Sequence, residues 1–139
     1  MKLIINTDGG ARGNPGPAGI GVVIQNSTGE ILKEYKEYIG NATNNVAEYK
    51  ALILAFEKCL NDLNLQPEIS VLQIRMDSEL IVRQMLGEYK IKEPTLKVLA
   101  AEVINLKSKF KSVSFEHVRR EFNKEADKLV NQAIDAATV

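Results

Sequence analysis

The stretch NTDGGARGNPG, residues 6–16, decides the fold and raises the first chemical question. It places Asp8 at the end of a short apolar run and follows it with a turn rich in glycine and proline. The β-branched run predicts a buried strand over residues 2–8, and the glycines and prolines predict a turn over residues 9–17. A carboxylate at the end of a buried strand needs a partner, because burial removes the water that solvates its charge.

The segments that follow predict the rest of a sheet. Residues 20–26 and 30–39 are expected to be strands joined by the hairpin sequence NSTGE, and residues 68–77 and 113–118 are expected to be two further strands. Three strands joined by short turns run antiparallel, whereas strands reached through helices run parallel to the first. The sequence therefore predicts one α/β domain over residues 1–139, of order βββαβααβα, with a five-stranded mixed sheet flanked by helices.

Four helices are predicted between and after these strands. Apolar residues recur at helical spacing over residues 46–63, with Thr43, Asn44 and Asn45 as candidate caps. A short helix over residues 78–86 can be stopped by Gly87, and a third helix opens at Pro94 and extends to about Phe110. The last helix covers residues 124–137, and Asn123 is expected to cap it.

Composition excludes several classes of protein. With 139 residues, 45% of them hydrophobic, the chain can bury a core, and 18 basic residues balance 18 acidic ones, which argues against broad electrostatic coating of DNA. The single cysteine, Cys59, is expected to be a buried thiol in a reducing compartment. No apolar run is long enough for a signal peptide or a membrane span, so we expect a soluble, cytoplasmic monomer without membrane contact or an obligate protein partner.

Four acids occupy positions that a solvated carboxylate would not choose. Asp8 and Asp77 close strands that are expected to be parallel neighbours, which would bring them to the same edge of the sheet. Glu48 and Asp127 lie near the starts of helices, at the border of the apolar stripe. No lysine or arginine partner is evident for all four, so a divalent cation is the economical explanation.

Each acid taken alone also has a simpler interpretation. Glu48 could form a capping box with Asn45, and Asp127 could interact with the helix dipole. Asp8 could be a turn residue, and Asp77 could begin an Asx cap. These alternatives do not explain why all four acids converge. Carboxylate oxygens suit Mg²⁺ or Mn²⁺ better than zinc, and two such ions roughly 4 Å apart are a device for phosphodiester cleavage.

Four segments together resemble the type 1 ribonuclease H family: TDGGARGNPGPAG (residues 7–19), TNNVAEYKAL (43–52), DSELIVRQM (77–85) and HVRREFNKEADKL (117–129). The match covers nearly the whole chain in order. The resemblance implies a ribonuclease H-like fold and an endonuclease that cuts the RNA strand of RNA/DNA hybrids by a two-metal-ion mechanism that leaves 3′-OH and 5′-phosphate ends. Cleavage of double-stranded RNA stays open as an alternative, because its minor groove also presents 2′-hydroxyls. Two Mg²⁺ ions are implied, with Mn²⁺ as a possible substitute.

The resemblance also implies roles for particular residues. The acidic quartet of the family maps onto Asp8, Glu48, Asp77 and Asp127, with Asp8 bridging both metals. Substrate contacts are implied at Gly9, Gly10, Arg12, Gly13, Asn14, Thr43, Asn44, Asn45 and Ser78. Among these, Gly9 and the three asparagines would read 2′-hydroxyls and base edges in the minor groove, and Thr43 would lie near a phosphate of the DNA strand.

The chain departs from many members of this family at two places. It has no tryptophan-containing basic protrusion, because only EYKIKE stands between Gly87 and Pro94. It also lacks a long loop with a histidine before the final helix. His117 is expected to lie within a strand and to be structural, which leaves Arg119, Arg120 and Glu121 as candidates near the site.

Two other functions remain open at this point. A hybrid-binding module without activity would have little need of four converging carboxylates. A related polynucleotidyl transferase would act on DNA, whereas the groove-reading asparagines favour RNA.

Overall fold

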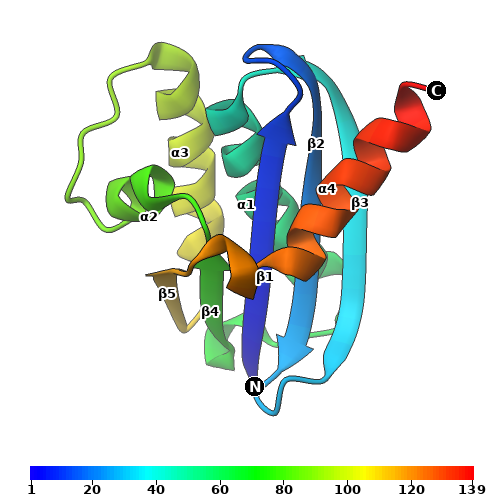
Figure 1. Ribbon diagram of the computed structural model, residues 1–139. Coiled ribbons are helices and arrows are strands. Elements are labelled where there is room, and N and C mark those ends of the chain that lie inside the picture. Colours follow the sequence, from blue (N-terminus) through cyan, green and yellow to red (C-terminus); the bar gives the residue numbers. More distant parts are fainter.

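The computed structural model describes residues 1–139 and contains one five-stranded sheet in the order β3-β2-β1-β4-β5 (Figure 1). The strands and helices follow the predicted order, with β1 to β3 antiparallel and β4 and β5 parallel to β1. Their bounds are β1 Lys2–Ala11, β2 Gly16–Asn26, β3 Ile31–Ala42, α1 Asn44–Asn61, β4 Val71–Met76, α2 Glu79–Met85, α3 Pro94–Lys107, β5 Ser112–His117 and α4 Lys124–Ala137. The predicted α/β fold class is confirmed.

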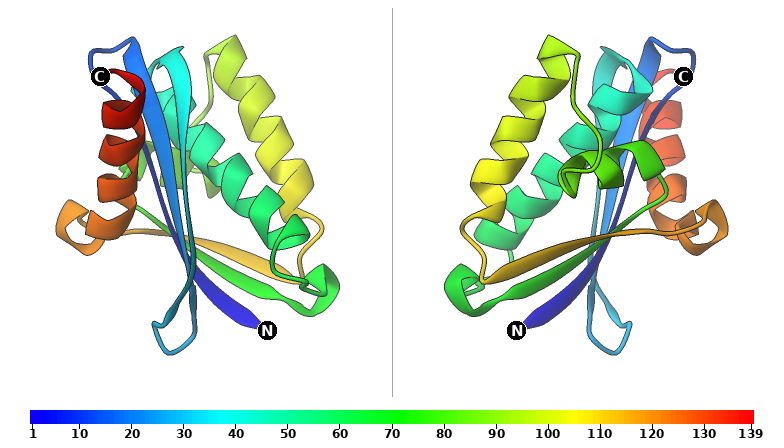
Figure 2. Two further views of the ribbon diagram at one scale, coloured as in Figure 1. Left: turned by 90° about the vertical axis from the view of Figure 1, so that its right-hand side faces the viewer. Right: turned by 90° about the vertical axis from the view of Figure 1, so that its left-hand side faces the viewer.

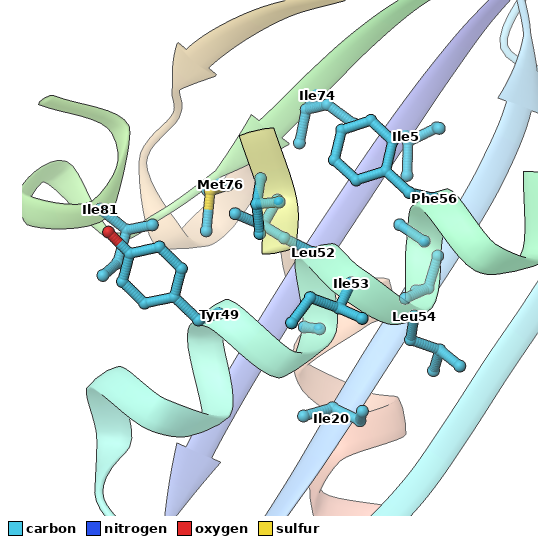
Figure 3. Close-up of a cluster of buried hydrophobic side chains, with 14 of the residues drawn as sticks. Ile5, Ile20, Tyr49, Leu52, Ile53, Leu54, Phe56, Ile74, Met76 and Ile81 are labelled. Atoms are coloured by element: carbon cyan, nitrogen blue, oxygen red, sulfur yellow. The ribbon is translucent and has the colours of Figure 1, made fainter. Parts of the chain in front are cut away.

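The helices form layers on the two faces of the sheet. Helices α1 and α3 lie on one face and α4 lies on the other (Figure 2). The α1 face holds the main core, a cluster of 25 buried hydrophobic residues in which Leu52 and Phe56 of α1 meet Ile5 and Ile74 of the sheet (Figure 3). The α4 face has a much smaller separate cluster, made of Val23, Ala126 and Leu129. None of the helices combines the length and the hydropathy that a membrane crossing requires.

The turn after Asp8 is shorter than the sequence predicted, and this prediction was wrong in its bounds. Gly9, Gly10 and Ala11 continue β1 and pair with β2, which already begins at Gly16. Only residues 12–15 lie outside the two strands, and Gly13 has a φ of 91°, which favours glycine.

Gly9 is a glycine because β1 and α1 touch at this point. A Cβ atom on Gly9 would lie 2.4 Å from the carbonyl carbon and oxygen of Ala47 and 2.6 Å from the amide nitrogen of Glu48. The same requirement recurs on the opposite face, where a Cβ atom on Gly21 of β2 would lie 2.5 Å from the carbonyl oxygen of Ala126 in α4. Missing side chains therefore let both helices approach the sheet closely beside Asp8.

The helix caps correct several sequence interpretations. Thr43 caps α1 by accepting the amide of Val46 at 3.3 Å, so Asn44 and Asn45 belong to the first turn and do not cap. Ser78, and not Asp77, caps α2 by accepting the amide of Ile81 at 3.3 Å. Asn123 stands at the cap position of α4 but makes no side-chain cap bond.

Other helix and strand boundaries differ from the predicted ones by a few residues. Helix α3 ends at Lys107, short of the predicted Phe110, and a 3₁₀ turn over Pro67–Ile69 delays the start of β4 to Val71. Gly87 follows α2 with a φ of 79°, which confirms its predicted role as a stop.

Candidate active site

Three carboxylates converge at one edge of the sheet. Asp8 lies in β1, Asp77 directly follows β4, and Glu48 lies in the first turns of α1. One carboxylate oxygen from each lies within 4.8 Å of the others. Asp8 is 7% exposed and Glu48 is 5% exposed, while Asp77 is half-buried. The parallel pairing of β1 with β4 brings the two aspartates together, as the sequence predicted.

The backbone of Gly9 holds two of these acids side by side. Its amide donates to Oδ1 of Asp8 at 3.0 Å and to Oε1 of Glu48 at 2.5 Å. This contact is possible because the absence of a side chain on Gly9 lets α1 approach β1. Glu48 therefore does not form the capping box with Asn45 that the sequence allowed, and its carboxylate points to Gly9 of β1 instead.

Burial and mutual repulsion raise the pKa values of the two buried acids. Burial, followed by the negative charge of Asp77, raises the pKa of Asp8 from 3.8 to about 8. Burial, followed by the charges of Asp8 and Asp77, raises the pKa of Glu48 well above its usual value. None of the five ion pairs of the protein involves these acids. The carboxylates therefore lack an internal cation that would compensate their charge.

Asp127 approaches the same place from the opposite face of the sheet. It lies in the first turn of α4, where it is half-buried, and it faces the cavity that the other three acids line. Its charge adds to the causes that raise the pKa of Asp8. It is not part of the compact group formed by Asp8, Glu48 and Asp77. Of the three candidates near the shortened loop, Arg120 lines this cavity.

The cavity has a volume of about 380 Å³ and collects most of the predicted site. Besides the four acids it is lined by six of the nine predicted substrate contacts, which are Gly9, Gly10, Arg12, Asn44, Asn45 and Ser78. Gly13, Asn14 and Thr43 lie outside its lining. The guanidinium of Arg12 is paired with Asp135 of α4 at 2.6 Å, and it also donates to the side chain of Asn131 at 3.3 Å.

Two asparagines form a hydrogen-bonded corner beside the cavity. Oδ1 of Asn14 accepts the backbone amide of Asn44 at 2.9 Å, and Oδ1 of Asn44 accepts the backbone amide of Ala11 at 2.8 Å. Both side chains are exposed, and neither Nδ2 group donates to the protein. The corner thus fixes each amide with its oxygen inward and its N–H donors outward.

His117 is the last residue of β5, as the sequence predicted, and lies outside the acidic cavity. It is exposed and lines a separate hollow with residues of α2. Its backbone pairs with Met76 of β4, but its side chain makes no hydrogen bond within the protein, so no side-chain bond supports the structural role expected for it.

Sequence reasoning missed a buried amide network behind the cavity. It joins Asn6 of β1, Gln25 of β2 and Asn123 before α4. The available signal was Asn6, a polar residue in an otherwise apolar run two positions before Asp8. Asn131 of α4, which lines the cavity, was also missed.

The donor set fits a hard divalent cation. All of the candidate ligands are carboxylate oxygens, two of them are buried, and none has a positively charged partner in the protein. Such a set matches the ligands of Mg²⁺ and Mn²⁺, whereas zinc prefers nitrogen and sulfur. The only histidine and the only cysteine, His117 and Cys59, lie elsewhere.

Comparison with known proteins gives a consistent result. The reverse transcriptase-like family model matches residues 6–133. The bifunctional protein Rv2228c of Mycobacterium tuberculosis is 46% identical over 138 residues, which are 99% of this chain and 36% of that protein. Ribonuclease HI of Halobacterium salinarum is 39% identical over 130 residues, which are 94% of this chain and 63% of that protein. The chain thus spans little more than a third of the mycobacterial relative.

A solved structure extends the likeness to three dimensions. LC11-RNase H1, solved in complex with an RNA/DNA hybrid, superposes with a TM-score of 0.88 at 52% identity, and the match covers 99% of each chain. Sequence, topology and the convergence of the acids agree, and the chain belongs to the reverse transcriptase-like family, among the type 1 ribonucleases H.

Proposed function

We propose that this chain is a metal-dependent endonuclease that hydrolyses the RNA strand of RNA/DNA hybrids. The observation that carries the proposal is the convergence of Asp8, Glu48 and Asp77 within 4.8 Å, without a cationic partner, in a cavity also lined by Asn44 and Asn45. The hybrid bound in the structure of LC11-RNase H1 and the ribonuclease HI of H. salinarum support this choice of substrate.

The four acids would hold two Mg²⁺ ions, or Mn²⁺ in their place. When bound, such ions lower the pKa of the attacking water and neutralise the charge on the leaving oxygen, which yields 3′-OH and 5′-phosphate ends. The protein supplies the ligands in a prepared arrangement. The amide of Gly9 orients Asp8 and Glu48, and burial keeps competing water away from them.

The asparagine corner supplies a way to recognise the RNA strand. The outward Nδ2 groups of Asn14 and Asn44 can donate to the acceptor atoms that base edges and ribose hydroxyls present in the minor groove. Because each oxygen is held by a backbone amide, the side chains cannot exchange donor for acceptor by rotating. The corner therefore favours acceptors such as the 2′-OH oxygen, which DNA lacks.

A cleavage assay on a labelled RNA/DNA hybrid tests the proposal. Double-stranded RNA, double-stranded DNA and single-stranded RNA serve as parallel substrates, each with Mg²⁺, Mn²⁺ or EDTA. We expect cutting of the RNA strand of the hybrid, and we expect EDTA to stop it. Hybrid binding without cutting would indicate a non-catalytic binding module. Equal cutting of a DNA duplex would indicate a DNA-directed enzyme of the same fold.

A further inference from the structure

Asn123 is hydrogen-bonded both to the backbone next to Asp8 and to the backbone of Asp127. It does not itself line the cavity that these acids share. Its side chain is buried, with 2% of the residue exposed, and both of its polar atoms are bonded. Nδ2 donates to the carbonyl oxygen of Thr7 at 3.0 Å, and Oδ1 accepts from Nδ2 of Asn6 at 3.0 Å. The Asn123 side chain is thus fully used within the protein.

These bonds connect the backbone at two of the acids. The carbonyl of Thr7 belongs to the peptide group that joins Thr7 to Asp8. The carbonyl of Asn123 accepts the amide of Asp127 at 3.1 Å. One residue therefore ties the strand immediately before Asp8 to the helical turn that carries Asp127.

Asn123 stands where an asparagine ordinarily caps a helix, and its bond to Thr7 takes the place of the cap bond. Asparagine is a favoured residue at the start of a helix, where its side chain usually accepts a backbone amide. Asn123 stands at that position before α4, yet it makes no cap bond. Its amide is directed at β1 instead, so α4 is attached to the sheet at the cost of its own cap.

The side-chain amides of Asn6 and Gln25 fix the orientation of this side chain. Nε2 of Gln25 donates to Oδ1 of Asn6 at 2.9 Å, which leaves Nδ2 of Asn6 to face Oδ1 of Asn123. The same Nδ2 also donates to the carbonyl of Phe122 at 3.4 Å. With the donors and acceptors in this sequence, Asn123 can present only its NH₂ group to Thr7.

We propose that Asn123 is a positioning residue that sets the place of Asp127 opposite Asp8 and thereby permits a second divalent cation to bind. Asp8, Glu48 and Asp77 are already brought together by β1, α1 and β4, whereas Asp127 lies outside their compact group and depends on the attachment of α4. The inference rests on the proposed function, because it takes the four acids as cation ligands.

Calorimetric titration with Mn²⁺ in the absence of nucleic acid tests this role directly. The wild-type chain is compared with Asn123→Ala, and with Asn6→Ala, which keeps the bond to Thr7 but removes the group that orients Asn123. We expect Asn123→Ala to weaken the lower-affinity Mn²⁺ site by about tenfold or more, as is typical when a residue that orients metal ligands is lost. Asn6→Ala should weaken the same site less, and the tighter site should change little in both.

Asn26→Ala provides a matched control. Its side chain also anchors backbone, accepting the amides of Thr28 at 3.1 Å and Glu30 at 2.9 Å, but in the β2–β3 hairpin away from the acids. We expect it to lower the melting temperature without changing either Mn²⁺ affinity. With RNA/DNA hybrid as substrate, Asn123→Ala should lower kcat and leave KM near the wild-type value.

The outcomes separate this inference from the proposed function. Wild-type Mn²⁺ affinities in Asn123→Ala, or equal losses in Asn26→Ala, would overturn the positioning role. A wild-type chain that binds two cations but cuts no nucleic acid would overturn the proposed function alone. A wild-type chain that binds no divalent cation would overturn both.

Discussion

The two faces of the sheet deliver their acids to the cavity in different ways. Glu48 comes from the α1 face, where 25 buried hydrophobic residues pack α1 against the strands, and it is 5% exposed. Asp127 comes from the α4 face, where the separate apolar cluster has three residues and an amide network adds to the apolar residues that α4 buries against the sheet. Apolar packing is dense but has no direction, whereas hydrogen bonds specify atoms. The α4 face therefore adds directional polar contacts to its apolar packing.

Replacing one acid from each face by the corresponding amide should give the largest difference in cleavage rate. We expect Glu48→Gln to lower kcat for hybrid cleavage by at least about 1,000-fold, or ~4 kcal/mol, because it removes a buried charge from the compact group. Asp127→Asn should cost only about 10- to 100-fold, since the half-buried amide keeps an oxygen ligand outside that group. Single-turnover cleavage measures both, with circular dichroism to confirm folding. Equal losses would contradict the distinction between the faces.

Adding a side chain at Gly9, where β1 and α1 touch, tests how the α1 face places Glu48. In Gly9→Ala the new Cβ atom would lie 2.4 Å from the backbone of Ala47, so α1 must move away. We expect a loss of about 3 kcal/mol in the free energy of unfolding, together with loss of Mn²⁺ binding. Gly10→Ala is the control, because its Cβ atom would meet no atom closer than 3.9 Å. Urea unfolding of the two variants gives the comparison, and similar stabilities would argue against the close approach.

Burial of Asp8, together with repulsion from the neighbouring acids, should make the metal-free protein less stable as the pH rises. The folded-state pKa of Asp8 is raised from 3.8 to about 8, so the folded chain holds the proton more tightly than the unfolded chain does. This stabilisation is complete below pH 3.8 and is lost as the pH rises to about 8. The slope should reach up to about 1.4 kcal/mol per pH unit for one group.

Urea unfolding in EDTA across this window measures the slope, and Asp8→Asn should flatten it. The raised pKa of Glu48 acts with the same sign and remains in that variant. Saturating Mg²⁺ should reduce the slope in the wild-type chain. A slope that is unchanged by Asp8→Asn would contradict the raised pKa of Asp8.

The smallest effect is expected at the far end of α4. Asp135 pairs there with Arg12 at 2.6 Å, but the two side chains are 66% and 45% exposed. Asp135→Ala should therefore change the free energy of unfolding by about 0.5 kcal/mol or less, and salt should remove the difference. A loss comparable with that of Gly9→Ala would show that ion pairing, and not the amide network, anchors α4.

Local patterns in the sequence were enough to predict the order of the elements and the four acids. Alternating and helical periodicities depend on which side chains face the core, and this information is written along the chain. Asp8 and Asp77 could be placed together because parallel neighbouring strands deliver their carboxyl ends to one edge of the sheet. Gly87 and Pro94 marked their helix boundaries because their backbone preferences are intrinsic.

Tertiary structure alone decided the features that depend on contacts distant in sequence. Gly9 resembles a turn residue in the sequence, and only the approach of α1 shows why β1 continues through it without a side chain. Asn123 resembles a helix cap, and only the proximity of Thr7 and Asn6, more than a hundred residues away, redirects its amide. The sequence thus determined which acids were candidates for the cavity, because side-chain type and periodicity are local properties. The fold decided how the groups are held, because a hydrogen bond or a close backbone contact exists only once its two partners have been brought together.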